Sequence, residues 1–175
     1  FGLFKKTEAY HKLRDSSAEI SLMVVPLTMA MTVNVLFVNS SLLIPGLWEV
    51  IEYLFPVAMT AFVAIGIYAL RILGDYFVRM FLHKGYSFEQ NNSLAPMVSI
   101  FALSMIAVGL AAPAAMSHVR EVIAISIALA SFFATSAALL MIVMLVIGFH
   151  SMLTHGIRPE AAPSLWLMIP ITTLL

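Results

Sequence analysis

The amino-acid sequence predicts an all-α integral membrane domain built from repeated helical hairpins. Of its 175 residues, 62% are hydrophobic and only 10% are charged, and the mean hydropathy is +1.01. A soluble domain of this size would need about a quarter of its residues charged to cover its surface. In addition, three apolar runs share one outline, in which small hydroxyl residues follow a proline. The composition therefore places the chain in a membrane, and the recurrence predicts its architecture.

The recurring unit is marked by Pro26, Pro96 and Pro170, which lie 70 and 74 residues apart along the chain. A unit of that length is too long for a solenoid repeat, and it suits a pair of membrane helices with their loops. A proline inside a spanning helix removes one backbone hydrogen bond and kinks the axis. We therefore expect three kinked helices that belong to successive hairpins.

The spans follow from the apolar runs and the turn residues between them. About 20 apolar residues cross a bilayer, and the sequence offers five such runs within a single transmembrane domain over 1–175. The expected spans cover residues 20–38, 48–70, 94–115, 122–149 and 164–175, and the last of them is truncated. The helical periodicity extends the second helix to 81. Both ends of the chain look cut, which predicts a segment of a longer polytopic protein.

Local residues support these boundaries. Asn39, Ser40 and Ser41 are turn residues that predict the end of the first helix. Glu49 and Glu52 stand in the first turns of the second helix, where the helix dipole favours negative charge. The third span has asparagine and serine before it as cap residues, and the fourth carries a face of small residues suited to close helix packing.

The basic residues predict the orientation. Lys and Arg concentrate in alternate loops, and the positive-inside rule then places residues 1–19, 71–92 and 150–163 in the cytoplasm of a cell membrane, expected to be the bacterial inner membrane. The three proline-bearing spans consequently run in the same direction, and the second and fourth spans return the chain. Parallel helical hairpins are the simplest description of this pattern.

Polar residues on the proline-bearing spans are the candidate functional residues. In lipid, a carbonyl freed by proline needs a neighbouring group or a water-lined cavity. Kinked helices that carry hydroxyl residues are therefore suited to the wall of an aqueous pore. The pore-lining candidates are Thr28, Thr32, Ser99 and Thr172. The alternative interpretation is that these small polar residues only mediate helix packing.

Several functions are disfavoured by what the sequence lacks. The absence of cysteine excludes disulfides and iron–sulfur clusters on this segment. The five histidines fall at span ends or in loops, and no metal-binding, nucleophile or nucleotide-binding signature is present. No Asp, Glu, Lys or Arg lies in the middle of a span, which disfavours a proton relay. We expect no enzyme, no metal, no cofactor and no nucleic-acid partner.

The pattern resembles the tellurite-resistance/C4-dicarboxylate transporter family, which includes the plant slow anion channels. Three motifs carry the resemblance: HKLRDSSAEISLMVVPLTMAM, NNSLAPMVSIFALSMIAVG and RPEAAPSLWLMIPITTLL. The resemblance implies ten helices arranged as five hairpins, with kinked inner helices around a central pore. The chain would supply family helices three to seven, about five of the ten transmembrane helices. The absence of a cationic residue at mid-span is a departure that puts anion selectivity by this segment in doubt.

The resemblance also implies a function, namely passage of small anions such as dicarboxylate, sulfite, chloride, nitrate or tellurite-type oxyanions. The expected partners are the lipid bilayer, the small anion and a homotrimer or larger membrane complex. An alternative from a different class is a non-transporting subunit or scaffold packed in a larger respiratory or assembly complex. A haem-carrying membrane anchor is a weaker third alternative.

Overall fold

The regular structure of the chain is helical throughout the part described. The computed structural model describes residues 8, 17–44, 47–82, 97–155, 166 and 168–175. By length and composition, four helices in these ranges can cross a membrane. The predicted all-α, multi-pass membrane fold is thus confirmed at this level. The elements are the 3-10 helix η2 (Ser17–Met23) and the α-helices α2 (Val24–Leu43), α3 (Leu47–Leu82), α4 (Met97–Met116), α5 (Arg120–His155) and α6 (Met168–Leu174).

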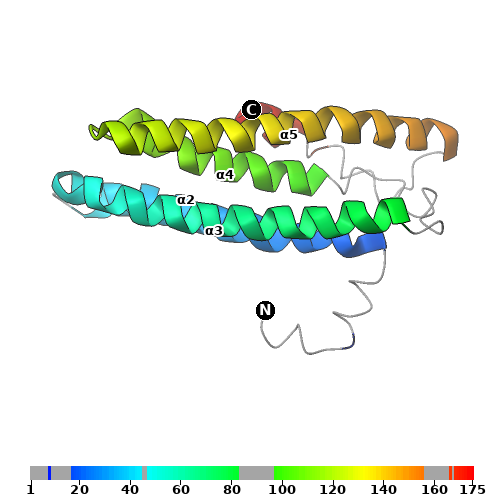
Figure 1. Ribbon diagram of the computed structural model, residues 1–175, viewed down its shortest axis with the longest axis horizontal. Coiled ribbons are helices and arrows are strands. Elements are labelled where there is room, and N and C mark those ends of the chain that lie inside the picture. The colour runs from blue at the N-terminus through cyan, green and yellow to red at the C-terminus, as the bar shows by residue number, and fades with distance from the viewer. Residues whose placement is uncertain (1–7, 9–16, 45–46, 83–96, 156–165, 167) are drawn as a thin grey trace.

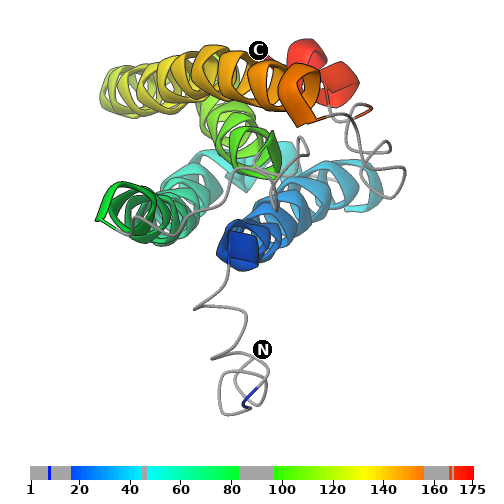
Figure 2. The same ribbon diagram turned by 90° about the vertical axis from the view of Figure 1, so that its right-hand side faces the viewer.

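The long helices form an antiparallel bundle with α4 at its centre. In Figure 1, α2 and α4 run in one direction, whereas α3 and α5 run in the other. The end-on view of Figure 2 shows α4 surrounded by the other helices, and α4 contacts η2, α2, α3, α5 and α6. More of α4 is buried than of any other candidate span. The core of the described bundle therefore lies around this one helix.

The prolines of the predicted repeat stand at helix starts rather than within the α-helices. Pro26 is the third residue of α2, just after the 3-10 helix η2, and Pro170 is the third residue of α6. Pro96 lies outside the described residues. A proline in the first turn removes no intrahelical hydrogen bond of that α-helix. The kinks at these positions remain a prediction, and the prolines inside α-helices are Pro56 in α3 and Pro113 in α4.

The first helix continues through the expected turn. Asn39, Ser40 and Ser41 lie within α2, so their assignment as a turn was wrong. The Ile44 N–H donates to the carbonyl of Ser40 at 3.0 Å and closes the last turn. Ile44 itself is extended, as expected for a residue that precedes proline, and it ends the helix.

Helix α5 likewise extends past the expected span. Residues 150–163 were predicted as a loop, yet the helix continues to His155. The sequence gives the reason, because neither glycine nor proline occurs between Gly148 and Gly156. The predicted boundary at 149 followed the end of the apolar run, which marks the end of a membrane span and need not mark the end of a helix. Residues 156–163 of the expected loop lie outside the described residues.

Two glycines allow aromatic rings to approach the helix backbone closely. A Cβ atom added at Gly109 of α4 would overlap the ring of Phe62 from α3. A Cβ atom added at Gly66 of α3 would overlap the ring of Phe133 from α5. Phe62 is 2% exposed and Phe133 is 4% exposed, so neither ring has free space into which it can move. These ring-on-glycine contacts fix how α3 packs against α4 and α5.

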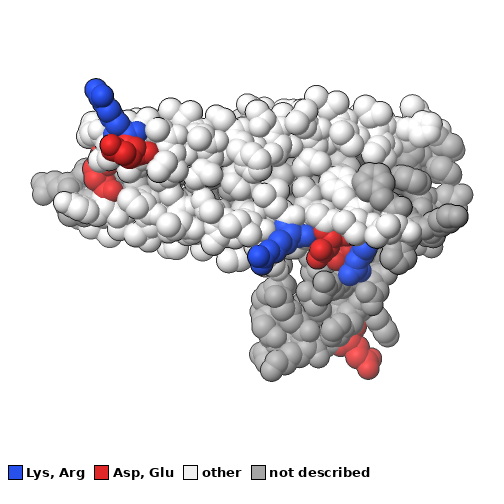
Figure 3. Space-filling view, viewed as in Figure 1, with Lys and Arg blue, Asp and Glu red and all other residues white. Residues whose placement is uncertain are grey.

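Charged side chains lie toward the ends of the bundle. In Figure 3 the charged groups gather in separate patches, and the surface between them is uncharged. At one patch, Glu19 of η2 is 4% exposed and lies 3.5 Å from the Nε atom of Arg79 in α3. This ion pair ties the start of the first span to the end of the second. The uncharged surface between the patches is what a membrane-embedded bundle requires.

We expect Gly109→Ala to destabilise the bundle by about 1–3 kcal/mol, the usual cost of overpacking a core. The matched control is Gly74→Ala on α3, because an added Cβ there meets nothing within 4 Å. The control should be neutral or slightly stabilising, since alanine is the better helix former. Denaturation of both variants in mixed micelles checks the prediction, and equal stabilities would contradict it.

Candidate functional site

The pore-lining candidates on α2 lie on its exposed surface. Thr28 and Thr32 are both exposed and are one helical turn apart. The Thr28 hydroxyl donates to the carbonyl of Val25 at 2.9 Å, and the Thr32 hydroxyl donates to the carbonyl of Thr28 at 2.7 Å. Each hydroxyl proton is therefore bound within the helix, and the oxygen atoms remain at the surface as the polar groups of this face.

The other two candidates have different surroundings. Thr172 of α6 is exposed, and its hydroxyl donates to the carbonyls of Met168 and Ile169 at 2.8 and 3.0 Å. Ser99 of α4 is fully buried, with 0% exposure. The described structure thus brings Thr28, Thr32 and Thr172 to surfaces and leaves Ser99 in the interior of the bundle.

The helices that carry these residues form a row. α4 contacts α2 and also contacts α6, whereas α2 and α6 do not touch within the described residues. Figure 2 shows α4 between α2 and α6. The order α2–α4–α6 makes neighbours of helices that start with the repeated proline unit. Geometrically, three adjacent helices can supply one part of a curved wall.

Two polar side chains tie α4 to its neighbours, and neither pairing was predicted from the sequence. The side-chain amide nitrogen of Asn34 in α2 donates to the carbonyl of Met105 in α4 at 3.2 Å. The Ser126 hydroxyl of α5 donates to the carbonyl of Leu110 in α4. Hydrogen bonds between membrane helices contribute about 0.6 to 2 kcal/mol each. Asn34 stood out as an amide in an apolar run, but its partner 71 positions away is evident only from the fold.

Glu52 joins α3 to the link between α4 and α5. One carboxylate oxygen accepts the backbone N–H of His118 at 2.6 Å, and the other accepts the hydroxyl of Ser117 at 2.8 Å. The Ser117 oxygen in turn accepts the N–H of Val119 at 3.1 Å. Glu52 was expected only to complement the dipole of its own helix, whereas its carboxylate also orders the start of α5.

Below this junction, a cavity of about 180 Å³ lies between α2, α3 and α4. Its walls are largely apolar, with Phe37, Phe55 and Phe62 among the lining residues. Asn34 is the only lining residue with a polar side chain. The cavity is therefore suited to a small, mostly apolar guest.

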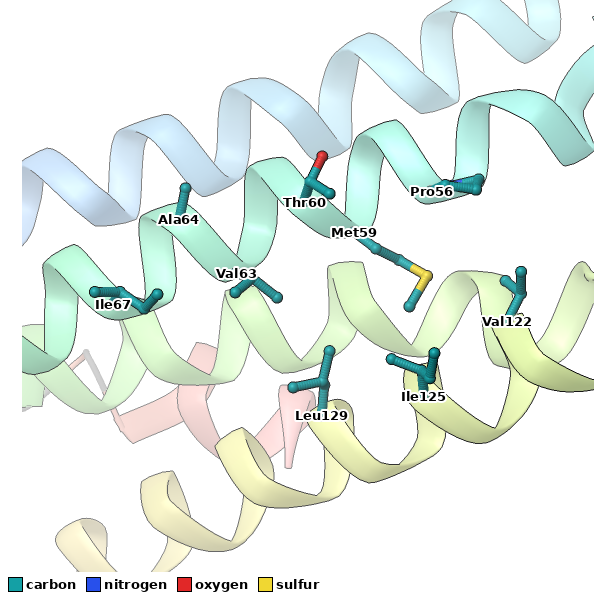
Figure 4. A pocket seen from close by; sticks show the side chains of 9 residues that line it. All are labelled: Pro56, Met59, Thr60, Val63, Ala64, Ile67, Val122, Ile125 and Leu129. Atoms are coloured by element: carbon teal, nitrogen blue, oxygen red, sulfur yellow. The ribbon is translucent and has the colours of Figure 1, made fainter.

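A second hollow lies between α3 and α5. Figure 4 shows Met59, Val63 and Ile67 of α3 facing Ile125 and Leu129 of α5 across this groove of about 420 Å³. Its one hydroxyl, that of Thr60, donates to the carbonyl of Val57 in its own helix at 2.8 Å. The groove is apolar and open, as expected for a surface that faces acyl chains.

The described helices do not assemble a metal centre. Within the described ranges, no group of three or more His, Asp, Glu or Cys side chains is placed to hold a metal ion. The polar groups of this part of the bundle are chiefly hydroxyls, one amide and the carboxylate at the α4–α5 link.

We expect Glu52→Ala to loosen the link between α4 and α5, because the N–H of His118 and the hydroxyl of Ser117 both lose their acceptor. Hydrogen–deuterium exchange should become faster at His118 and Val119. Glu121→Ala serves as the control, since Glu121 is an exposed carboxylate in the first turn of α5. Unchanged exchange in Glu52→Ala would show that the carboxylate does not order the link.

No protein-family model, no curated protein and no solved structure matches this chain. The resemblance drawn from its motifs therefore remains a hypothesis, and the function is inferred from the geometry of the bundle.

Proposed function

We propose that this chain forms part of the wall of a membrane pore that passes small anions. The observation that carries the proposal is the row α2–α4–α6, with exposed hydroxyl residues on both flanking helices. Thr28 and Thr32 supply them on α2, and Thr172 and Thr173 supply them on α6. A closed pore needs more wall than three helices provide, so further helices or further copies of the protein would complete the ring.

The chemistry of this wall suits rapid passage rather than tight binding. Conduction requires that a solute bind well enough to enter and weakly enough to leave. Hydroxyl groups offer hydrogen bonds without a fixed charge, and α4 contains no Asp or Glu that would repel an anion. The anions that fit this description are chloride, nitrate, sulfite, small dicarboxylates and tellurite-type oxyanions.

The family resemblance supports the same proposal. In the tellurite-resistance/C4-dicarboxylate transporter family, the expected pore is a ring of kinked inner helices with the returning helices outside. Adjacent helices of the same direction, such as α2 and α4, are what such a ring needs. Ser99 is buried beside this row, so we now assign it to helix packing and retain the threonines as the wall.

The second candidate is a packing subunit that transports nothing. The observation that favours it is that the hydroxyl protons of Thr28, Thr32 and Thr172 are bound by their own helices. Residues of this kind are common in helices that only pack against protein or lipid. Co-purification with stoichiometric membrane partners, together with absent anion flux, would support this candidate.

The two candidates are separated by flux measurements on the purified protein in liposomes. With Thr32→Val we expect chloride or nitrate flux to change about fivefold, because a hydrogen-bonding group is worth about 1 kcal/mol at the barrier. The matched control is Thr135→Val on α5, since Thr135 is also exposed and also donates to its own helix, to Ser131 at 2.7 Å.

The control should leave flux unchanged, because α5 lies outside the row α2–α4–α6. Absence of flux in the unmodified protein would overturn the proposal. Equal effects of Thr32→Val and Thr135→Val would remove α2 from the wall.

A further inference from the structure

The cavity between α2, α3 and α4 has a buried floor and an exposed rim. Phe55 and Phe62 of its lining are each 2% exposed. Val38 is 59% exposed and Met116 is 40% exposed, and Ala112 is exposed as well. A guest can therefore enter past the rim and come to rest against the aromatic floor.

Pro113 gives this cavity a backbone acceptor. In a regular helix the carbonyl of residue i accepts the N–H of residue i+4, and proline has no N–H to donate. The carbonyl of Gly109 therefore lacks that partner. Because a helix carbonyl projects along the axis toward residues i+3 and i+4, this oxygen lies beside Ala112 and Pro113, and both residues line the cavity.

Asn34 adds a second acceptor to the cavity lining. Its amide nitrogen donates to the carbonyl of Met105 at 3.2 Å, which fixes the amide against α4. The oxygen of the same amide can accept a hydrogen bond. The cavity thus combines aromatic and aliphatic walls with acceptor oxygens on α2 and α4.

We propose that this cavity binds a small amphiphile, a compact hydrocarbon body that carries one hydroxyl donor, such as a phenol or a short alcohol. The volume of about 180 Å³ fits this class, since an apolar cavity of about 150 Å³ in another protein binds benzene. The apolar body lies against the phenylalanine floor, and the hydroxyl donates to the carbonyl of Gly109. The site is independent of the proposed pore wall, because none of the exposed threonines lines it.

The test compares 4-fluorophenol with fluorobenzene by ¹⁹F NMR on the purified protein in detergent micelles. Fluorobenzene has the same ring but no hydroxyl. We expect saturable binding of both probes, with 4-fluorophenol bound about fivefold more tightly because it makes one additional hydrogen bond. Binding of neither probe above the level in empty micelles would overturn the proposal.

Two variants locate the site. Ala112→Phe at the rim should abolish saturable binding of both probes, because the larger side chain closes the entrance. The matched control is Ala111→Phe, the neighbouring exposed residue, which does not line the cavity and should bind both probes as the unmodified protein does. Unchanged binding in Ala112→Phe would show that the probes bind elsewhere.

Pro113→Ala tests the acceptor itself. Alanine returns an N–H to the carbonyl of Gly109, so the preference for 4-fluorophenol should fall toward unity while fluorobenzene still binds. Circular dichroism and gel filtration of this variant verify that the bundle is intact. If the folded variant keeps the full preference, the assignment of the Gly109 carbonyl as the acceptor is wrong.

Discussion

The close approach of α4 to its neighbours is the constraint on which the rest of the structure depends. Between helices in lipid there is little hydrophobic driving force, so association relies on van der Waals contact and hydrogen bonds. Gly109 lets the ring of Phe62 contact the backbone of α4, and Gly66 does the same for Phe133. With the ties from Asn34 and Ser126, these contacts hold α4 at the centre, and its central place in turn makes neighbours of α2 and α6.

Several features of the bundle were accessible from the sequence because they depend on composition and local pattern. The membrane class followed from the scarcity of charge, and the all-helical fold followed from long apolar runs. The ends of α2 and α5 were misplaced for a physical reason. Asn39 and the serines after it are compatible with the last turn of a membrane helix, and the chain near His150 contains no helix-breaking residue. Apolar runs locate membrane spans more directly than they locate helix ends.

The candidate site was less accessible, because it depends on which side chain meets which helix. Thr32 and Ser99 looked equivalent as hydroxyl residues after a proline, yet one is exposed and the other is buried. Moments of nearly uniformly apolar helices carry little information about facing. The contact of Glu52 with Ser117 and His118 joins positions about 65 residues apart and could not be inferred from spacing. Pro113 was visible in the sequence, but its relation to a cavity required the fold.

The unequal lengths of the paired helices α4 and α5 have a consequence for the surrounding membrane. At 1.5 Å per residue, the 20 residues of α4 extend about 30 Å, which matches the hydrocarbon thickness of a typical bilayer. The 36 residues of α5 extend about 54 Å, and no charged residue interrupts them after Glu121. The outer helix must therefore tilt, protrude or thicken the lipid around it. The bundle is consequently sensitive to bilayer thickness through α5, while α4 fits the same bilayer without adjustment.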